Sequence, residues 1–374
     1  MNLLYGASSI GQQLIPNNKL DVECPSGVTV VRFSPSGMLF ATGSQVGKVF
    51  IWSTQLMDIR KTLSSFDSPV VDIHWSIDER KLLVQGELKC AWLNVSDGKK
   101  LQEFVFSSPV RFCSLNGKTS EFIVTDFEGK CIAINIETRA QETLVESGML
   151  AAKYFSSSGD IIILCGVDYL SIYNRHNKIE VKFKDFQSIG KYKEVKQIQV
   201  YDNKFLLNVG NEIQYFQVIG REIIHVNSFC DPVIKQNYTD CHFWNQGSAA
   251  SASVASESYL QIWDLNNGNL KDSLNGSSQG SLGFSWHPSL PVLLAVSGNS
   301  LHFWENKSGN APDTFVSGLN WTQINVVYEE SETEFDLLSD DEEITLAKPT
   351  ESTEIDTKTW KTSALHSDLT FFKH

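Results

Sequence analysis

Short apolar runs separated by polar turns recur along most of the chain. The stretch from Phe33 to Trp52 is FSPSGMLFATGSQVGKVFIW, in which an apolar strand, a polar turn, a second apolar strand and a glycine-bearing turn precede a third strand that ends in Trp. WSIDERKLLVQGELKCAWL (75–93) and WHPSLPVLLAVSGNSLHFW (286–304) follow the same order, and weaker copies lie between them. Helical periodicity is nearly absent, so the pattern predicts β-strands almost throughout.

The large residues near the ends of the third strands give the length of the repeat. They are Trp52, Trp92, Ile134 (in a degenerate copy), Tyr173, Tyr215, Trp263 and Trp304. The intervals are 40, 42, 39, 42, 48 and 41 residues, a spacing typical of WD-repeat blades with four strands each. One such unit cannot bury both its faces, whereas units in a closed ring cover one another.

We therefore predict an all-β fold, a seven-bladed WD-repeat β-propeller with an extended acidic C-terminal tail. The alternative from the same pattern is a pair of β-sandwiches. The only literal WD pair is Trp263-Asp264, and no blade opens with Gly-His. A ring also needs an outer strand that joins its last blade to its first, and we favour the N-terminal segment for this role.

Charge is distributed unevenly along the 374 residues, whose net charge is −13. Residues 326–374 contain thirteen acidic residues and four Lys, a net charge of −9, which leaves −4 for residues 1–325. We predict three regions: 1–24, a segment that contributes to ring closure; 25–325, the propeller; and 326–374, an extended partner-binding tail. No signal peptide or transmembrane run is predicted.

Motifs for catalysis or for metal binding are absent from the sequence. The seven Cys and eight His show no metal-ligand spacing, and G-x-S-x-G, H-E-x-x-H and Walker loops are missing. The scattered Cys favour buried thiols in a reducing compartment. We predict no catalytic residues, no metal and no cofactor, and we favour an interaction scaffold over a propeller hydrolase.

One basic stretch, residues 175–196, has seven Lys/Arg against three acidic residues. It is interpreted either as a solvated edge strand protected by Lys or as a phosphate-contacting, nucleic-acid-facing patch. The cations of this candidate patch are Arg175, Lys178, Lys182, Lys184, Lys191 and Lys193.

The acidic stretch VYEESETEFDLLSDDEE (327–343) has nine carboxylates and no Lys or Arg, yet it includes Tyr328, Phe335 and two Leu. A strand in a hydrophobic core would not tolerate this charge, and a tail that only stays solvated needs no such apolar residues. The pattern therefore favours a segment that becomes ordered on a partner. A merely solvated acidic tail is the alternative.

The layout resembles the retinoblastoma-binding protein 5 family, the WD-repeat propeller subunits of COMPASS and MLL-type complexes, and looks like a fungal member. The similarity is strongest in MNL with the first blade to Trp52, in LQIWDLNNGNL to LHFW, and in VVYEESETEFDLL. It implies a non-catalytic accessory subunit of a histone H3 lysine-4 methyltransferase, a chromatin regulator in the nucleus. No membrane association is implied.

The resemblance also implies partners for the tail. Docking on and stabilising the SET-domain subunit would involve Tyr328, Glu330, Glu334, Phe335, Asp336 and Leu337. Binding of the SPRY-domain subunit would involve Asp340, Asp341, Glu342 and Glu343. A motif for a second WD-repeat subunit would include Ile344, Thr345 and Leu346, although it overlaps the acidic run. The late blades lack the basic loops of animal members, so contact with nucleosomal DNA is expected to be weak or indirect. A scaffold in another nuclear or trafficking assembly is the alternative.

Overall fold

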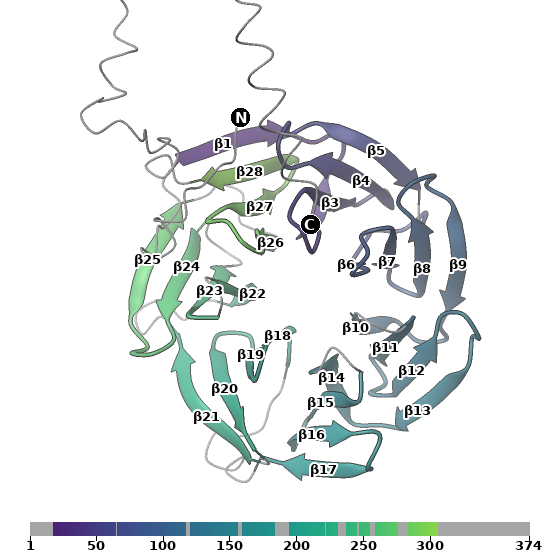
Figure 1. The fold of residues 1–374 in the computed structure, drawn as a ribbon, viewed down its shortest axis with the longest axis vertical. Helices are drawn as coiled ribbons and strands as arrows, with labels where there is room; N and C mark the ends of the chain where they lie inside the picture. Colours follow the sequence, from purple (N-terminus) through teal and green to yellow (C-terminus); the bar gives the residue numbers. More distant parts are fainter. Residues whose placement is uncertain are drawn as a thin grey trace, which may run out of the picture. The chain divides into compact units, whose positions relative to one another are not determined.

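Seven antiparallel sheets of four strands each make up the part of the chain that the computed structural model describes (Figure 1). The described residues are 18–64, 66–116, 120–155, 159–183, 194–220, 222–230, 237–244, 247–254, 259–275 and 283–305. They contain strands and turns and no helix, so they also contain no helix that could cross a membrane. They belong to the first of two units into which the chain divides, residues 1–313 and 314–374.

Each sheet forms one blade, and blades 1 to 6 are built from consecutive strands. Blade 1 contains β2 (Val28–Phe33), β3 (Leu39–Ser44), β4 (Lys48–Ser53) and β5 (Ile59–Ser64). Blade 2 contains β6 (Asp72–Trp75), β7 (Lys81–Gln85), β8 (Lys89–Asn94) and β9 (Lys100–Val105). Blade 3 contains β10 (Val110–Leu115), β11 (Glu121–Asp126), β12 (Cys131–Asn135) and β13 (Gln141–Val145). Blade 4 contains β14 (Met149–Tyr154), β15 (Ile161–Gly166), β16 (Leu170–Asn174) and β17 (Ile179–Lys182).

The remaining three blades follow the same order, and the last one also takes the first strand of the chain. Blade 5 contains β18 (Gln197–Tyr201), β19 (Lys204–Asn208), β20 (Ile213–Ile219) and β21 (Glu222–Phe229). Blade 6 contains β22 (Tyr238–Trp244), β23 (Ala249–Val254), β24 (Tyr259–Asp264) and β25 (Leu270–Asn275). Blade 7 contains β26 (Gly283–Trp286), β27 (Leu293–Ser297), β28 (Ser300–Glu305) and β1 (Asn18–Glu23).

The innermost strands of the blades surround a central channel. The strands β2, β6, β10, β14, β18, β22 and β26 each contact the next one, and β26 contacts β2, so the ring is closed (Figure 1). The predicted seven-bladed propeller is therefore confirmed. All seven marker residues used to measure the repeat, Ile134 included, lie on the third strand of a blade.

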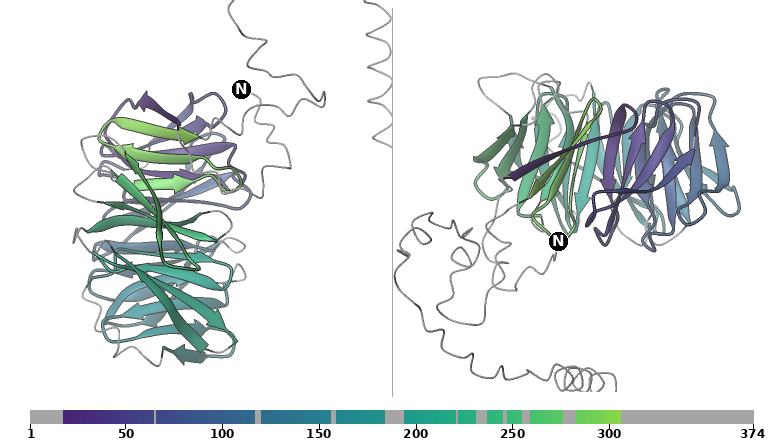
Figure 2. Two further views of the ribbon diagram at one scale, coloured as in Figure 1. Left: turned by 90° about the vertical axis from the view of Figure 1, so that its left-hand side faces the viewer. Right: turned by 90° about the horizontal axis from the view of Figure 1, so that it is seen from above.

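The last blade is completed by the beginning of the described chain. Strand β1 pairs antiparallel with β28, from Asn18 opposite Glu305 to Glu23 opposite Ser300. In the side views of Figure 2 the purple first strand lies beside the light green strands of blade 7. His302 Nδ1 lies 2.6 Å from Asp21 Oδ1 across this pair. One sheet thus combines strands from two distant parts of the sequence, which links blade 7 to the start of blade 1. The predicted boundary at residue 325 lies outside the described residues.

The hydrophobic core is divided among the joints between blades. Each of seven clusters of buried side chains is shared by two neighbouring blades. At the joint of blades 7 and 1, Phe40 stacks on Trp52 with 5.6 Å between ring centroids, and both are at most 2% exposed. Because both faces of each sheet are covered in this way, the strands can be apolar on both sides, as their sequences are.

A turn of blade 7 is held against a turn of blade 1 by His287. Its Nδ1 accepts hydrogen bonds from the backbone N–H groups of Ser289 and Leu290 at 3.2 and 3.0 Å, so the proton of the neutral ring lies on Nε2. Gly37, with φ +77°, packs so closely on this ring that an added Cβ would lie 2.1 Å from Nε2. Burial lowers the pKa of His287 to about 4, against a weaker opposing effect of a hydrogen bond with the Gly37 backbone.

The free energy of unfolding should therefore fall as the pH is lowered from 6.5 towards 4. The unfolded chain, in which the His287 pKa is 6.5, takes up a proton that the folded ring resists until pH 4. His287 alone should contribute a slope of up to about 1.4 kcal/mol per pH unit in this window. Urea unfolding of wild type and His287→Asn at several pH values measures it, because Asn keeps an acceptor but does not titrate. If the free energy of unfolding depends on pH in the same way in both proteins, His287 is not the source of this pH dependence.

Candidate interaction sites of the propeller

The residues that the sequence predicts for binding partners through the tail lie outside the described residues. This applies to the SET-docking, SPRY-binding and WD-repeat-binding residues alike, all of which fall between residues 328 and 346. Three cations of the predicted basic patch, Lys184, Lys191 and Lys193, also lie outside them. The structure therefore places only Arg175, Lys178 and Lys182 among the predicted site residues.

Arg175 connects two blades. It follows β16 in blade 4, and its Nη1 donates to both carboxylate oxygens of Glu121 on β11 at 2.9 Å. Its Nη2 bonds to Glu142 on β13. The side chain is only 21% exposed, so this guanidinium is already engaged by two carboxylates of blade 3. Lys182, 66% exposed, is paired with Glu180 at 3.6 Å, and Lys178 is exposed in the turn between β16 and β17.

Arg175→Ala should lower the free energy of unfolding by about 1–2 kcal/mol, because Glu121, 17% exposed, would lose its partner at the joint of blades 3 and 4. The matched control is Lys182→Ala, whose exposed pair should contribute no more than about 0.5 kcal/mol. Chemical unfolding of the three proteins measures both values. Equal effects of the two substitutions would contradict a structural role of Arg175.

A ring of polar side chains, which the sequence analysis did not identify, surrounds the channel. Each innermost strand contributes one residue, in the same register against the next strand of its blade. We call this set the polar ring: Arg32, His74, Ser114, Lys153, Gln199, His242 and Ser285. A sequence signal for it exists, because each of these residues directly precedes an apolar residue near the end of the innermost strand of its blade.

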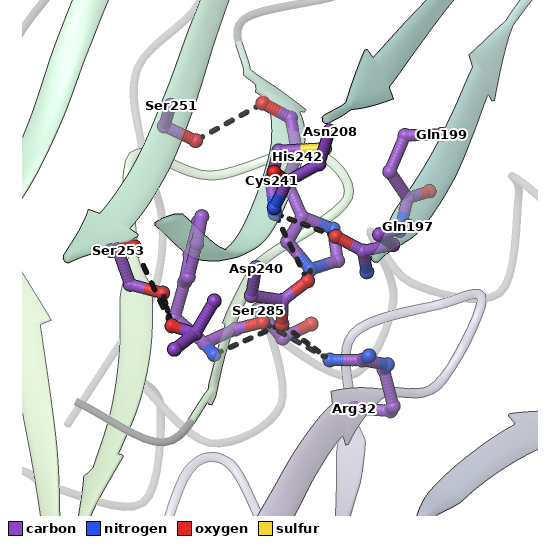
Figure 3. A network of polar contacts seen from close by, with 12 residues as sticks. Arg32, Gln197, Gln199, Asn208, Asp240, Cys241, His242, Ser251, Ser253 and Ser285 are labelled. Atoms are coloured by element: carbon purple, nitrogen blue, oxygen red, sulfur yellow. Dashed lines mark hydrogen bonds and ion pairs between the residues drawn. The ribbon is translucent and has the colours of Figure 1, made fainter. Parts of the chain in front are cut away.

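Arg32 of the polar ring joins four blades, and Figure 3 shows it together with Asp240. From β2 its Nε lies 3.0 Å from Asp72 Oδ1 on β6, and its Nη1 lies 3.2 Å from Asp240 Oδ2 on β22. The same Nη1 donates to the carbonyl oxygen of Phe284 on β26 at 3.2 Å. Strands of blades 1, 2, 6 and 7 are thus connected through one guanidinium.

The environment of Asp240 favours its charged form. Burial by itself would raise the pKa of this carboxyl, but His242 and Arg32 outweigh burial and hold the pKa well below its ordinary value. The backbone N–H of Phe284 also donates to it at 3.4 Å. Because the folded-state pKa is lowered, the contribution of Asp240 to stability is present above its unfolded pKa of 3.8 and is lost as the pH falls below that value.

The buried cysteines are poorly suited to catalysis. Six of the seven thiols are buried, and Cys230 is exposed. Burial raises the pKa of Cys131 to about 12 and that of Cys24 to about 11, so these thiols are not nucleophilic at neutral pH. Within the ranges that the structure describes, no group of three or more His, Cys, Asp or Glu side chains is arranged to hold a metal ion.

Comparisons with known proteins identify relatives over most of the chain, although no family model matches it. The chain is 24% identical to "Retinoblastoma-binding protein 5 homolog" of Drosophila melanogaster over 93% of its own length and 75% of that protein. It is 23% identical to "Set1 complex component swd1" of Schizosaccharomyces pombe, over 83% of each chain.

A solved structure shows the same fold. The crystal structure of the Cps50 (Swd1) β-propeller domain of Myceliophteria thermophila superposes with a TM-score of 0.69 at 21% identity, over 77% of this chain and 99% of that domain. The resemblance to the retinoblastoma-binding protein 5 family is thus confirmed. One relative is by name a component of a Set1 complex, which agrees with the expectation of an accessory subunit rather than an enzyme.

Proposed function

We propose that this chain is a non-catalytic WD-repeat scaffold subunit of a COMPASS-like histone H3 lysine-4 methyltransferase complex. The observation that carries the proposal is the extent of its match to the Drosophila homologue of retinoblastoma-binding protein 5. A span of 93% of 374 residues is about 348 residues, which leaves about 26 outside it. A continuous match of that span must include residues 327–343, so the relationship extends beyond the propeller into the acidic stretch.

In this proposal the tail docks on the SET-domain catalytic subunit and stabilises it. The docking residues are Tyr328, Glu330, Glu334, Phe335, Asp336 and Leu337. The acidic residues steer the segment towards basic surfaces. Burial of Phe335 would contribute about 1.5–3 kcal/mol, whereas ordering ten residues costs on the order of 10 kcal/mol. Apolar anchors therefore need additional charge-assisted hydrogen bonds and backbone pairing on the partner.

Two further contacts complete the proposed scaffold. Asp340, Asp341, Glu342 and Glu343 would bind the SPRY-domain subunit, and Ile344, Thr345 and Leu346 would belong to the motif for a second WD-repeat propeller. The proposed region for these contacts is 326–374, after a propeller that ends by residue 325. A subunit of such a complex would be located in the nucleus.

The nucleosome would be the substrate of the whole complex, and this chain would contact its DNA weakly or indirectly. The engagement of Arg175 by Glu121 and Glu142 supports weak contact, because a guanidinium paired in this way is not available for phosphate. The exposed Lys178 and Lys182 would be the contributors from the described part of the basic patch.

Affinity purification of the tagged full-length chain from nuclear extract, followed by quantitative mass spectrometry, tests the proposed assembly. A SET-domain methyltransferase, a SPRY-domain protein and a second WD-repeat protein should be recovered in near-stoichiometric amounts. Recovery of a different assembly, or hydrolase activity of the chain purified without partners, would reject the proposal in favour of one of its alternatives.

A further inference from the structure

The centre of the ring contains a cavity of about 370 Å³. Six residues of the polar ring line it: Arg32, His74, Lys153, Gln199, His242 and Ser285. Apolar walls are added by Trp75 and Phe112, among others. The cavity is therefore large enough for a side chain or a small organic molecule, and it presents polar groups from six of the seven blades.

Within this cavity, Lys153 is a positive charge with no carboxylate partner. Its Nζ donates to the carbonyl oxygen of Ile198 at 2.8 Å and to Gln199 Oε1 at 3.3 Å, and both acceptors are neutral. Among the described residues no Asp or Glu oxygen lies within 4.0 Å of it. An ammonium group has three N–H donors, so two are used and one remains for another acceptor.

The two carboxylates nearest in the ring are committed to another cation. Asp72 and Asp240 both bond to Arg32, at 3.0 and 3.2 Å. Arg32, Asp72 and Asp240 together carry one positive and two negative charges, and His242 Nε2 also lies 3.2 Å from Asp240 Oδ1. Lys153 stands apart from these residues on β14, in blade 4. Burial lowers the Lys153 pKa, although Asp72 partly opposes this effect, as expected for an ammonium group in need of a counter-ion.

His74 also lines the cavity, but its Nε2 does not open onto it. Its Nε2 is buried and, among the described residues, has no hydrogen-bond partner. Asp72 Oδ2 is 3.7 Å away, which is too long for a hydrogen bond. Because this nitrogen is enclosed by protein atoms, the remaining N–H donor of the Lys153 ammonium group, rather than His74, indicates an acceptor supplied by a ligand in the cavity.

We propose that the central cavity binds a carboxylate, with Lys153 as its counter-ion. A monoanion fits better than a dianion such as phosphate, because one cation is unpaired while Asp72 and Asp240 add negative charge nearby. The carboxylate would belong to a small organic acid or to an acidic side chain of a peptide that enters the channel. This site is independent of the function proposed for the tail.

Ligand-observed NMR titrations of the full-length protein test this site. The probes are glutarate, its neutral analogue glutaramide, and the peptide acetyl-Gly-Glu-Gly-amide. Glutarate or the peptide should bind saturably, with a Kd on the order of millimolar, and glutaramide should not. Binding of both identifies the carboxylate group itself as the ligand, and binding of the peptide alone identifies an acidic side chain as its source.

Two variants attribute the binding to Lys153. Lys153→Gln removes the charge but keeps an N–H donor for the Ile198 carbonyl, and it should weaken binding roughly 10-fold to 100-fold. The matched control is Lys204→Gln, because Lys204 Nζ also donates to a backbone carbonyl, that of Gly247 at 3.1 Å, but does not line the cavity. This control should bind like wild type.

The result that overturns the proposal is the absence of saturable binding for both carboxylate probes, or equal binding of glutarate and glutaramide. Unchanged affinity in Lys153→Gln would also overturn it, and Lys153 would then be only a structural tie between blades 4 and 5. If Lys153→Gln does not fold, the comparison of glutarate with glutaramide on the wild-type protein still decides whether charge is recognised.

Discussion

Arg32→Met should lower the free energy of unfolding by about 3–5 kcal/mol, the scale measured when one partner of a buried ion pair is removed. The reason is the position of the guanidinium, which is 16% exposed and bonded to Asp72 and Asp240. Met fills a similar volume but leaves both carboxylates without their shared cation. Asp240, 7% exposed, then becomes a poorly compensated buried charge.

Urea unfolding of wild type and variant measures this effect. The matched control is Arg60→Met, because Arg60 is 52% exposed and paired with the equally exposed Asp58, so its loss should cost at most about 0.5 kcal/mol. The triple variant Arg32→Met, Asp72→Asn, Asp240→Asn should recover part of the loss, since it removes the unpaired charges. A loss in Arg32→Met no larger than in the control would show that this group does not stabilise the ring.

Phe335→Ala should weaken docking on the SET-domain subunit by about 2–4 kcal/mol, the scale of an interface hot spot. Phe335 is the only Phe in the acidic stretch and lies between Glu334 and Asp336. Its ring would be the buried anchor, and the flanking carboxylates would meet Arg or Lys at the rim. Calorimetric titration of the full-length chain into the SET-domain subunit measures the loss.

Two controls isolate the contribution of this side chain. Phe371→Ala changes a Phe of the same tail outside the acidic stretch and should leave the affinity unchanged. The midpoint temperature of thermal unfolding of the propeller should be the same in wild type, Phe335→Ala and Phe371→Ala. Equal affinities of wild type and Phe335→Ala would show that Phe335 is not the anchor. The alternative, an acidic tail that is merely solvated, would then be favoured.

The ring could be predicted from the sequence because its information is local and repeated. Each blade contains the same apolar pattern within about forty residues, and even Ile134, in a degenerate copy, lies on a third strand. Packing of neighbouring blades needs only strands with apolar residues on both faces, a requirement that many sequences satisfy. The repeated order of apolar runs and polar turns makes such strands visible in the sequence.

The channel could not be predicted in the same way because its partners are distant in sequence. Arg32 and Asp240 are 208 residues apart, and each stands in an ordinary strand sequence, VVRF or TDCHFW. Only the closed ring brings them together. A polar residue near the end of each innermost strand is visible in the sequence, but the pairs that these residues form depend on blade geometry.

The basic stretch at residues 175–196 shows how distant partners change the interpretation of a local charge count. The local excess of Lys and Arg there allowed either a solvated edge strand or a surface for phosphate, and the structure shows that one of these cations, Arg175, is bonded within the fold to Glu121 and Glu142. Those two acidic residues precede it by 54 and 33 residues. A count of charges along the sequence cannot include such partners.

Methylation of recombinant H3 nucleosomes by a reconstituted complex, assembled with and without this chain, tests the central claim most directly. The other subunits are the SET-domain, SPRY-domain and second WD-repeat proteins, and methylation at lysine 4 is quantified by mass spectrometry. We expect the rate to fall at least about 10-fold without the chain, as the loss of a stabilising contact of about 1.4 kcal/mol or more requires. An equal rate with and without the chain would contradict its role as a subunit that supports the methyltransferase.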